Sequence, residues 1–356
     1  MPAGRVRCGE YLRQPDTAAR RGRCAVAFDE RDLIDRLFRP LAGPGSLDLL
    51  DDTALIVPPP GCDLVITKDM IAAGVHFLPD DPPETVARKV LRVNLSDLAA
   101  KGAEPLGYLL GAGFGRRVGE RWIEAFCEGL AVDQDIYGIA LLGGDTIATS
   151  AGAVFSVTMI GTVPSGKMVT RSGGQPGDAL YVTGFIGSAA AGLAAQSGAE
   201  TPWAGLADPV KARLIERYRL PEPAMALAPI VRAHASAAMD ISDGLVGDCD
   251  KLAAASGCTA VINARTVPVD PELIPEAVEP DVLAGLFTGG DDYQILAAIP
   301  TSDESPFCEA AAAVGVDVSK IGRLVAGSGP VTVLLDGEAM ALPARSYVHG
   351  RGKEGP

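Results

Sequence analysis

Residues 93–105 read VNLSDLAAKGAEP and place an aspartate, Asp97, among leucine and alanine residues. The apolar pattern begins near residue 84 and predicts a helix over residues 84–100. The acidic side chain beside an apolar run is one instance of a pattern that recurs along the chain.

Aspartates recur beside apolar runs, at positions where we expect strand ends and turns. They are Asp51 and Asp52 before ALIV, Asp69 after LVITK, Asp145 after ALLGG, Asp240 and Asp243 in MDISDG, and Asp291 and Asp292 after FTGG. A single aspartate beside glycine is usually a turn residue that accepts hydrogen bonds from local backbone amides. The recurrence of aspartate beside apolar runs favours a shared role for some of these residues.

Convergence of these carboxylates would require cations. Two carboxylates about 4 Å apart repel by about 4 kcal/mol at an effective dielectric constant near 20. Hard oxygen ligands select Mg²⁺, which also bridges nucleotide phosphates. Convergence would therefore indicate metal-dependent phosphate chemistry, but the spacing leaves open whether the carboxylates converge.

Composition narrows the class of protein. The chain has 356 residues, 47% of them apolar, and a formal net charge of −14. This length and apolar content predict two globular domains. An acidic surface repels a phosphate backbone, so we expect no nucleic-acid partner. There is no uninterrupted apolar run of about 18 residues, so we expect no membrane span.

The seven cysteines include no CxxC pair, and the chain has only three histidines. These features argue against a disulfide framework and against a zinc site. They predict a reduced, cytoplasmic protein.

Helix-like and strand-like patterns alternate in each half, which predicts a mixed α/β (α+β) protein. The expected parts are a disordered basic extension (1–28), an N-terminal domain (29–163), a C-terminal α/β domain (164–350) and a tail (351–356). Further helices are expected at 30–42, 120–132, 208–218 and 223–233, and strands at 139–143, 153–162, 179–184, 260–263, 294–299 and 331–335. The apolar runs 54–57 and 64–67 flank PPPGC, which predicts a hairpin.

The usual phosphate-binding loops are absent, since the chain has neither GxxxxGK[ST] nor GxGxxG at a strand-to-helix turn. Glycine-rich substitutes are GGDT at 143–146, TRSGGQPGD at 170–178 and TGFIGSAAAG at 183–192. Glycine there allows either a close approach of phosphate or close helix packing.

Six segments in a fixed order resemble thiamine-monophosphate kinases, in the aminoimidazole-ribonucleotide synthetase-like superfamily, over roughly residues 30–349. They are LVITKDMIAAGVHFLPD (64–80), VNLSDLAAKGAEP (93–105), LLGGDT (141–146), TRSGGQPGD (170–178), MDISDGLVGD (239–248) and TGGDDY (288–293). The GVHF element and the NLSDLAAKGAEP form are those of the kinase branch.

The resemblance implies a fold and a reaction. The N-terminal sheet would pair with a second copy to form a dimeric β-barrel, and the C-terminal domain would cover the cleft. The γ-phosphoryl group of ATP would pass in line to thiamine monophosphate, with several Mg²⁺ ions holding the anionic partners. No protein nucleophile is expected, because the substrate phosphate is already ionised.

The resemblance also implies roles for individual residues. The Mg²⁺ ligands would be Asp52, Thr67, Asp69, Asp97, Asp145, Asp240 and Asp243. The ATP contacts would be Gly144, Asp145, Arg171 and Ser242, and the thiamine monophosphate contacts would be His76, Asp291 and Tyr347. Taken alone, a histidine between Val75 and Phe77 is more often structural; the run AAGVHFLPD favours the substrate role.

The chain departs from the family pattern at four places. Leu50 stands where glycine is common, and Lys68 stands where some members have a threonine that ligates metal. A protonated lysine cannot ligate Mg²⁺, so this position either loses a ligand or supplies a fixed cation in place of metal charge. Asp291 stands where glutamate is common and has a shorter reach, and the ending SYVHG around Tyr347 also differs.

Two other classes of function remain open on the sequence. One is another ATP-using enzyme of the superfamily, such as an amide- or formyl-activating synthetase, a selenophosphate-forming enzyme or a carbamoyl-dehydrating maturation factor. The other is a non-catalytic nucleotide- or thiamine-binding protein, whose mark would be lost metal ligands. Only Lys68 fits that mark.

Overall fold

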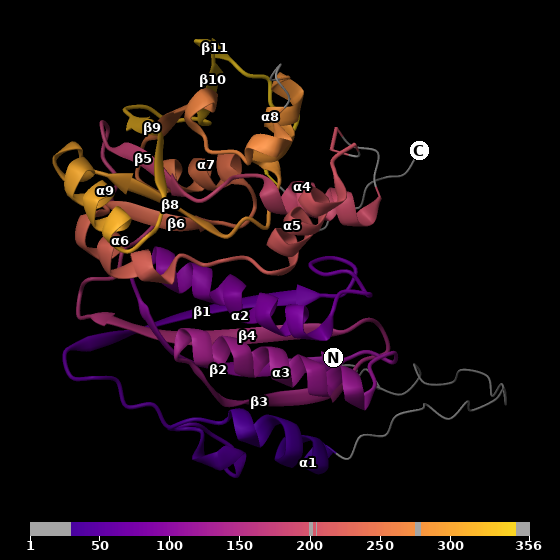
Figure 1. The fold of residues 1–356 in the computed structure, drawn as a ribbon. Helices are drawn as coiled ribbons and strands as arrows, with labels where there is room; N and C mark the ends of the chain where they lie inside the picture. The colour runs from indigo at the N-terminus through magenta and orange to yellow at the C-terminus, as the bar shows by residue number, and fades with distance from the viewer. Residues whose placement is uncertain (1–29, 199–201, 204, 275–278, 347–356) are drawn as a thin grey trace, which may run out of the picture.

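The computed structural model describes residues 30–198, 202–203, 205–274 and 279–346. Its N-terminal half is a four-stranded sheet with two long helices, α2 (Pro83–Ala100) and α3 (Glu120–Tyr137), on one face (Figure 1). The strand order is β1 (Cys62–Ala72), β4 (Val154–Pro164), β2 (Glu104–Phe114) and β3 (Ala140–Ala148). β4 is antiparallel to β1 and β2, and β3 is parallel to β2.

Aromatic stacking fills the core between this sheet and α3. The rings of Phe126 and Phe155 lie 4.5 Å apart, and Trp122 stacks on both. The residues before the sheet are helical but irregular, in segments α1 (Glu30–Leu33), η1 (Ile34–Phe38), η2 (Arg39–Leu41) and η3 (Leu47–Leu49).

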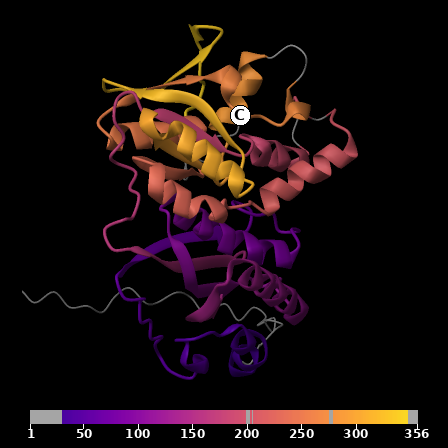
Figure 2. The same ribbon diagram turned by 60° about the vertical axis from the view of Figure 1, so that its left-hand side comes forward.

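The C-terminal half is a mixed seven-stranded sheet with helices on both faces (Figures 1 and 2). Its strand order is β11 (Glu338–Ala339), β10 (Thr332–Leu335), β7 (Thr259–Asn263), β9 (Val318–Val325), β5 (Ala179–Thr183), β8 (Gln294–Ile299) and β6 (Ala237–Ile241). One face packs on α6 (Ala228–His234) and α9 (Glu304–Ala313). The other face packs on α4 (Ser188–Ser197), α5 (Asp208–Arg219), α7 (Leu245–Ala255) and α8 (Pro280–Thr288). Single turns η4 (Met225–Leu227), η5 (Ala264–Thr266), η6 (Pro271–Leu273) and η7 (Thr301–Asp303) complete it.

Helix α2 lies between the two sheets and holds them together (Figure 1). Its end residues Ala99 and Ala100 share a buried cluster with Phe307 of α9. Lys101, which follows the helix, donates from Nζ to the Ala238 carbonyl at 2.7 Å. Polar residues of α2 that face the C-terminal sheet therefore lie at the boundary between the domains.

The mixed α/β class with two sheets is confirmed, and the helices predicted at 84–100, 120–132 and 208–218 are present. The predicted hairpin is wrong. Residues 54–57 form no strand, and β1 pairs instead with β4, Cys62 opposite Pro164. Three consecutive prolines after residue 57 lack the amide donors that a strand ladder needs. Strands β2, β6, β9 and β11 and helices α7, α8 and α9 were not predicted.

Across the described residues, no helix is both long enough and apolar enough to cross a membrane. The basic extension and the tail lie outside the described residues.

A buried ion pair joins the two long helices of the N-terminal half. Asp133 of α3 is fully buried and accepts from Arg88 Nε at 2.9 Å and from Arg92 Nε at 2.7 Å. Arg92 also donates to the Pro221 carbonyl at 3.0 Å, which extends this contact to the C-terminal half.

Replacing Asp133 tests how much this contact stabilises the fold. Asp133→Ala leaves two guanidinium groups without their buried counter-charge, so we expect the free energy of unfolding to fall by about 3–5 kcal/mol. Urea denaturation followed by tryptophan fluorescence measures it. Asp336→Ala removes the exposed ion pair with Arg265 and should cost far less; equal losses would contradict the assignment.

Candidate active site

Four of the predicted metal ligands come together between β1, α2 and β6. The Thr67 hydroxyl on β1 donates to the Asp97 carboxylate on α2. The backbone N–H of Asp69 donates to Asn94 Oδ1, also on α2, at 2.9 Å. Asp240 lies near the end of β6 and is buried. Pairing of β1 with α2 therefore brings Asp69 and Asp97 to the domain boundary, where β6 adds Asp240.

The pKa values reflect this crowding. Burial, followed by the charges of Asp97 and Asp243, raises the pKa of Asp69 to about 6. Burial, followed by the charges of Asp97, Asp248 and Asp69, raises the pKa of Asp240 well above its usual value. These carboxylates therefore destabilise one another when all are ionised.

The first turn of α7 adds a further acidic residue, Asp248. The buried Asp248 carboxylate accepts from the backbone N–H groups of Ser242 at 3.0 Å and Asp243 at 2.9 Å. Lys251 donates to Asp248 at 2.7 Å and to Asp243 at 2.5 Å. Gly244 has φ of 111°, and a Cβ there would meet the Gly289 carbonyl at 2.8 Å. Asp248 thus fixes the turn that presents Ser242 and Asp243.

A cavity of about 440 Å³ opens beside this cluster. Asp69, Ser242 and Asp243 line its acidic end, and His76 and Asp291 also face it. Apolar side chains, including Val75 and Leu193, complete the wall. An apolar cavity with a few convergent polar groups is the usual form of a small-molecule site.

Three predicted site residues lie elsewhere. Asp52, Gly144 and Asp145 line a second cavity, of about 730 Å³, at the β3 edge of the sheet. Cross-strand pairing places Asp69 and Gly144 at the same level on opposite edges, three strand spacings or about 14 Å apart. Because side chains alternate along a strand, Asp145 projects to the face opposite Asp69. A single chain does not unite the two groups.

The other residues that the sequence singled out lie at different places. Arg171 lies close enough to Lys101 for its charge to lower the pKa of that lysine, although burial lowers it more. Asp97 and Asp240 also act on Lys101, which places Arg171 near the acidic cluster. Lys68 is exposed on the outer face of β1. Tyr347 lies outside the described residues.

Two family models match the chain. They are the AIR synthase related protein N-terminal domain, over residues 50–163, and the AIR synthase related protein C-terminal domain, over residues 175–334. A thiamine-monophosphate kinase of Caulobacter vibrioides is 43% identical over 351 residues, covering 96% of each chain. The chain belongs to the thiamine-monophosphate kinase family.

Solved structures of the family have the same fold. The thiamine-monophosphate kinase of Stenotrophomonas maltophilia superposes with a TM-score of 0.76 at 35% identity, covering 88% of this chain and 98% of that one. A structure of AaThiL complexed with AMPPCP and TMP gives a TM-score of 0.70 at 29% identity, covering 84% and 91%. The predicted family is thus confirmed over both domains.

The donor set of the cluster fits a hard cation. Every candidate ligand supplies oxygen, as Mg²⁺ prefers, and burial with mutual repulsion raises the pKa of two of the carboxyls. Within the described ranges, no three His, Cys, Asp or Glu side chains already stand close enough together to hold a metal ion. Nucleotide phosphates and water would therefore supply the other ligands.

Sequence reasoning missed three residues of the site, Lys89, Asp248 and Tyr293. Lys89 lies in an ordinary helical pattern, and its contacts are 13 and 202 residues away in the chain. Asp248 and Tyr293 stand inside the quoted motifs MDISDGLVGD and TGGDDY, so the motifs contained them without indicating a role.

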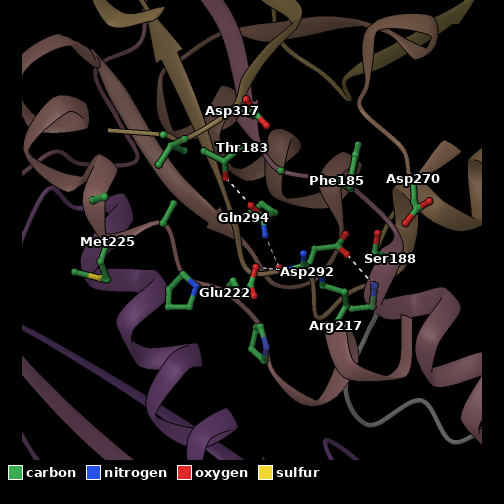
Figure 3. Close-up of a pocket in the computed structure, with 18 of the residues that line it drawn as sticks. Thr183, Phe185, Ser188, Arg217, Glu222, Met225, Asp270, Asp292, Gln294 and Asp317 are labelled. Atoms are coloured by element: carbon green, nitrogen blue, oxygen red, sulfur yellow. Dashed lines mark hydrogen bonds and ion pairs between the residues drawn. The ribbon is translucent and has the colours of Figure 1, made fainter. Parts of the chain in front are cut away.

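A larger cavity, of about 850 Å³, lies beside β5 and α5 (Figure 3). Several of its polar side chains bind one another. Arg217 pairs with Glu222, and the Thr183 hydroxyl donates to Gln294 at 2.7 Å. We assign no ligand to this cavity.

The raised pKa of Asp69 predicts how stability depends on pH. The folded state holds the proton more tightly than the unfolded state, so the metal-free protein loses stability as pH rises from about 4 through the folded pKa of about 6. Asp69→Asn removes this penalty. We expect it to raise the free energy of unfolding by about 2–3 kcal/mol at pH 8 and to give little gain at pH 4. Urea denaturation with a chelator present measures both values, and a loss of stability at pH 8 would contradict the crowding.

Proposed function

We propose that this protein transfers the γ-phosphoryl group of ATP to thiamine monophosphate, forming thiamine diphosphate and ADP. The observation that carries the proposal is the meeting of Asp69, Asp97, Asp240 and Asp243 beside a small cavity, which Asp69 and Asp243 line. The family supports it, since relatives of nearly equal length are named thiamine-monophosphate kinases.

The lining of the cavity is acidic in part and apolar in part, which suits a substrate with a phosphate and a less polar organic part. The thiamine part would lie against His76, Asp291 and the apolar wall, and the phosphate would lie at the acidic end. A volume of about 440 Å³ is within the range of small-molecule sites.

The acidic end would hold Mg²⁺ through Asp69, Asp97, Asp240 and Asp243, with Thr67 beside them. When bound, the metal supplies positive charge that screens the two anionic reactants. The protein's part is to hold the reactants in line and keep them apart from bulk water. An oxygen of the substrate phosphate forms a bond to the γ-phosphorus, and the bond from that phosphorus to the bridging oxygen of ADP breaks. Arg171 and Ser242 are our proposed ATP contacts at this end.

A second copy would complete the site. The face of the N-terminal sheet away from α2 and α3 exposes five apolar side chains, Leu64, Ile66, Met70, Leu109 and Ile147. Two such sheets closed into a barrel would cover these side chains and pair the free edges. If β1 of one copy lies beside β3 of the other, the partner's Gly144 and Asp145 approach the acidic cluster. Asp52 would join them from the same cavity.

The rival functions have less support. The named relatives disfavour another enzyme of the superfamily, and the intact acidic cluster disfavours a non-catalytic binding protein.

The five described cysteines are free thiols, consistent with the proposed cytoplasmic location.

A coupled assay of ADP formation, with chromatography for thiamine diphosphate, tests the activity. We expect product with ATP, Mg²⁺ and thiamine monophosphate, and none when Mg²⁺ is omitted. Asp69→Asn should lower kcat/KM at least about 100-fold, because charge screening by metal contributes several kcal/mol to such reactions.

Asp63→Asn is the matched control for this assay. Asp63 stands on the same strand but accepts from Ser165 and Gly166 away from the cavity, so its variant should retain near-normal activity. A folded wild-type protein that binds ATP without forming thiamine diphosphate would contradict the proposed function.

Light scattering tests the dimer. We expect twice the chain mass for the wild type and the chain mass for Ile66→Glu, which places a charge on the apolar face where Ile66 is 62% exposed. Ile136→Glu, on α3 at 56% exposure, is the control and should leave the mass unchanged. A monomeric wild type would contradict the dimer.

A further inference from the structure

Lys89 of α2 is almost completely buried, with 2% of its surface exposed. Its ammonium group donates to the His76 carbonyl at 2.8 Å and to Asp291 Oδ2 at 3.2 Å. It also lies 3.8 Å from the centre of the Tyr218 ring, within range of a cation–π contact. One buried cation therefore joins both of the proposed substrate residues.

The loop that carries His76 is fastened at further points by the C-terminal half. The Tyr218 hydroxyl donates to the same His76 carbonyl at 3.1 Å. Farther along, the buried Asp81 accepts from Arg219 Nε at 2.7 Å and from Gln196 Nε2 at 2.5 Å. Helices α4 and α5 thus hold the loop together with Lys89 of α2.

The backbone and the carboxylate of Asp291 are held by different partners. Its φ is 71°, and its N–H donates to the Ser242 carbonyl at 2.9 Å. The carboxylate is close enough to Tyr293 to raise the pKa of that phenol, after the larger effect of burial, and the charges of Asp69 and Asp240 act on the same phenol. Lys89 Nζ donates to Oδ2 of this carboxylate and so determines where one carboxylate oxygen lies.

We propose that Lys89 is a positioning residue for thiamine monophosphate, acting through the Asp291 carboxylate and the His76 loop. The proposal rests on the proposed function and adds to it a residue that does not itself line the cavity. Lys89 stabilises the substrate end of the cavity, whereas the acidic end depends on other side chains. Losing it should therefore weaken binding of thiamine monophosphate and spare ATP.

Steady-state kinetics of Lys89→Met tests this separation. We expect the KM for thiamine monophosphate to rise at least tenfold while the KM for ATP stays within twofold. Arg88→Met is the matched control, since Arg88 precedes Lys89 on the same helix and pairs with Asp133, which keeps its bonds to Arg92. Both KM values should stay within twofold in that variant.

A double-mutant cycle distinguishes positioning from a general loss of structure. In the wild-type background, Asp291→Asn should raise the KM for thiamine monophosphate several-fold. If Lys89 acts through Asp291, the same substitution should raise that KM less than twofold in the Lys89→Met background. Additive effects, equal changes in both KM values, or an unchanged KM would overturn the proposal.

The outcomes also separate this proposal from the proposed function. A wild type that forms no thiamine diphosphate overturns both, whereas an active wild type with a normal Lys89→Met variant overturns the role of Lys89 alone. If Lys89→Met does not fold, Tyr218→Phe replaces it. That variant removes only the hydroxyl on the His76 carbonyl and should raise the KM for thiamine monophosphate two- to fivefold with the KM for ATP unchanged; no rise would overturn the proposal.

Discussion

The repulsion between the carboxylates that crowd the domain boundary is the constraint on which the rest of the structure depends. Asp69, Asp97 and Asp240 come from three different elements, and burial and mutual charge raise the pKa of Asp69 and Asp240. Lys251 and Lys101 offset part of this charge without removing it. This arrangement destabilises the metal-free protein. Bound cations would offset the negative charge of both the cluster and the anionic reactants, which explains why the cluster is acidic.

Helix α2 makes this arrangement rigid. It packs on both sheets and carries Asp97 at the acidic end and Lys89 at the substrate end. Eight residues separate the two, or about 12 Å along the axis of a regular helix. The two ends of the cavity are therefore positioned by one element, whose buried ion pair with Asp133 fixes it to the N-terminal half.

Local patterns in the sequence predicted most elements of regular periodicity, including α2 and α3. They failed at residues 54–57, where the three prolines that follow lack the amide donors of a strand ladder, so that β1 pairs with β4 alone. The aspartates that converge were identified in advance, but their roles came from the resemblance, since spacing carries no information about distance between elements. Lys89 could not be found from the sequence, because its contacts depend on the fold. The separation of Asp145 from Asp69 could not be found from the sequence either, because it depends on the order of the strands in the sheet.

Proton release on metal binding tests the central claim that the carboxylates form a cation site. Metal-free protein is titrated with Mg²⁺ at pH 6, with a non-hydrolysable ATP analogue present, by calorimetry in two buffers of different ionisation enthalpy. The account predicts net release of protons, because metal ligands must be ionised and the pKa of Asp69 is about 6. It also predicts a smaller release for Asp69→Asn. Binding without proton release, or identical release by both proteins, would contradict it.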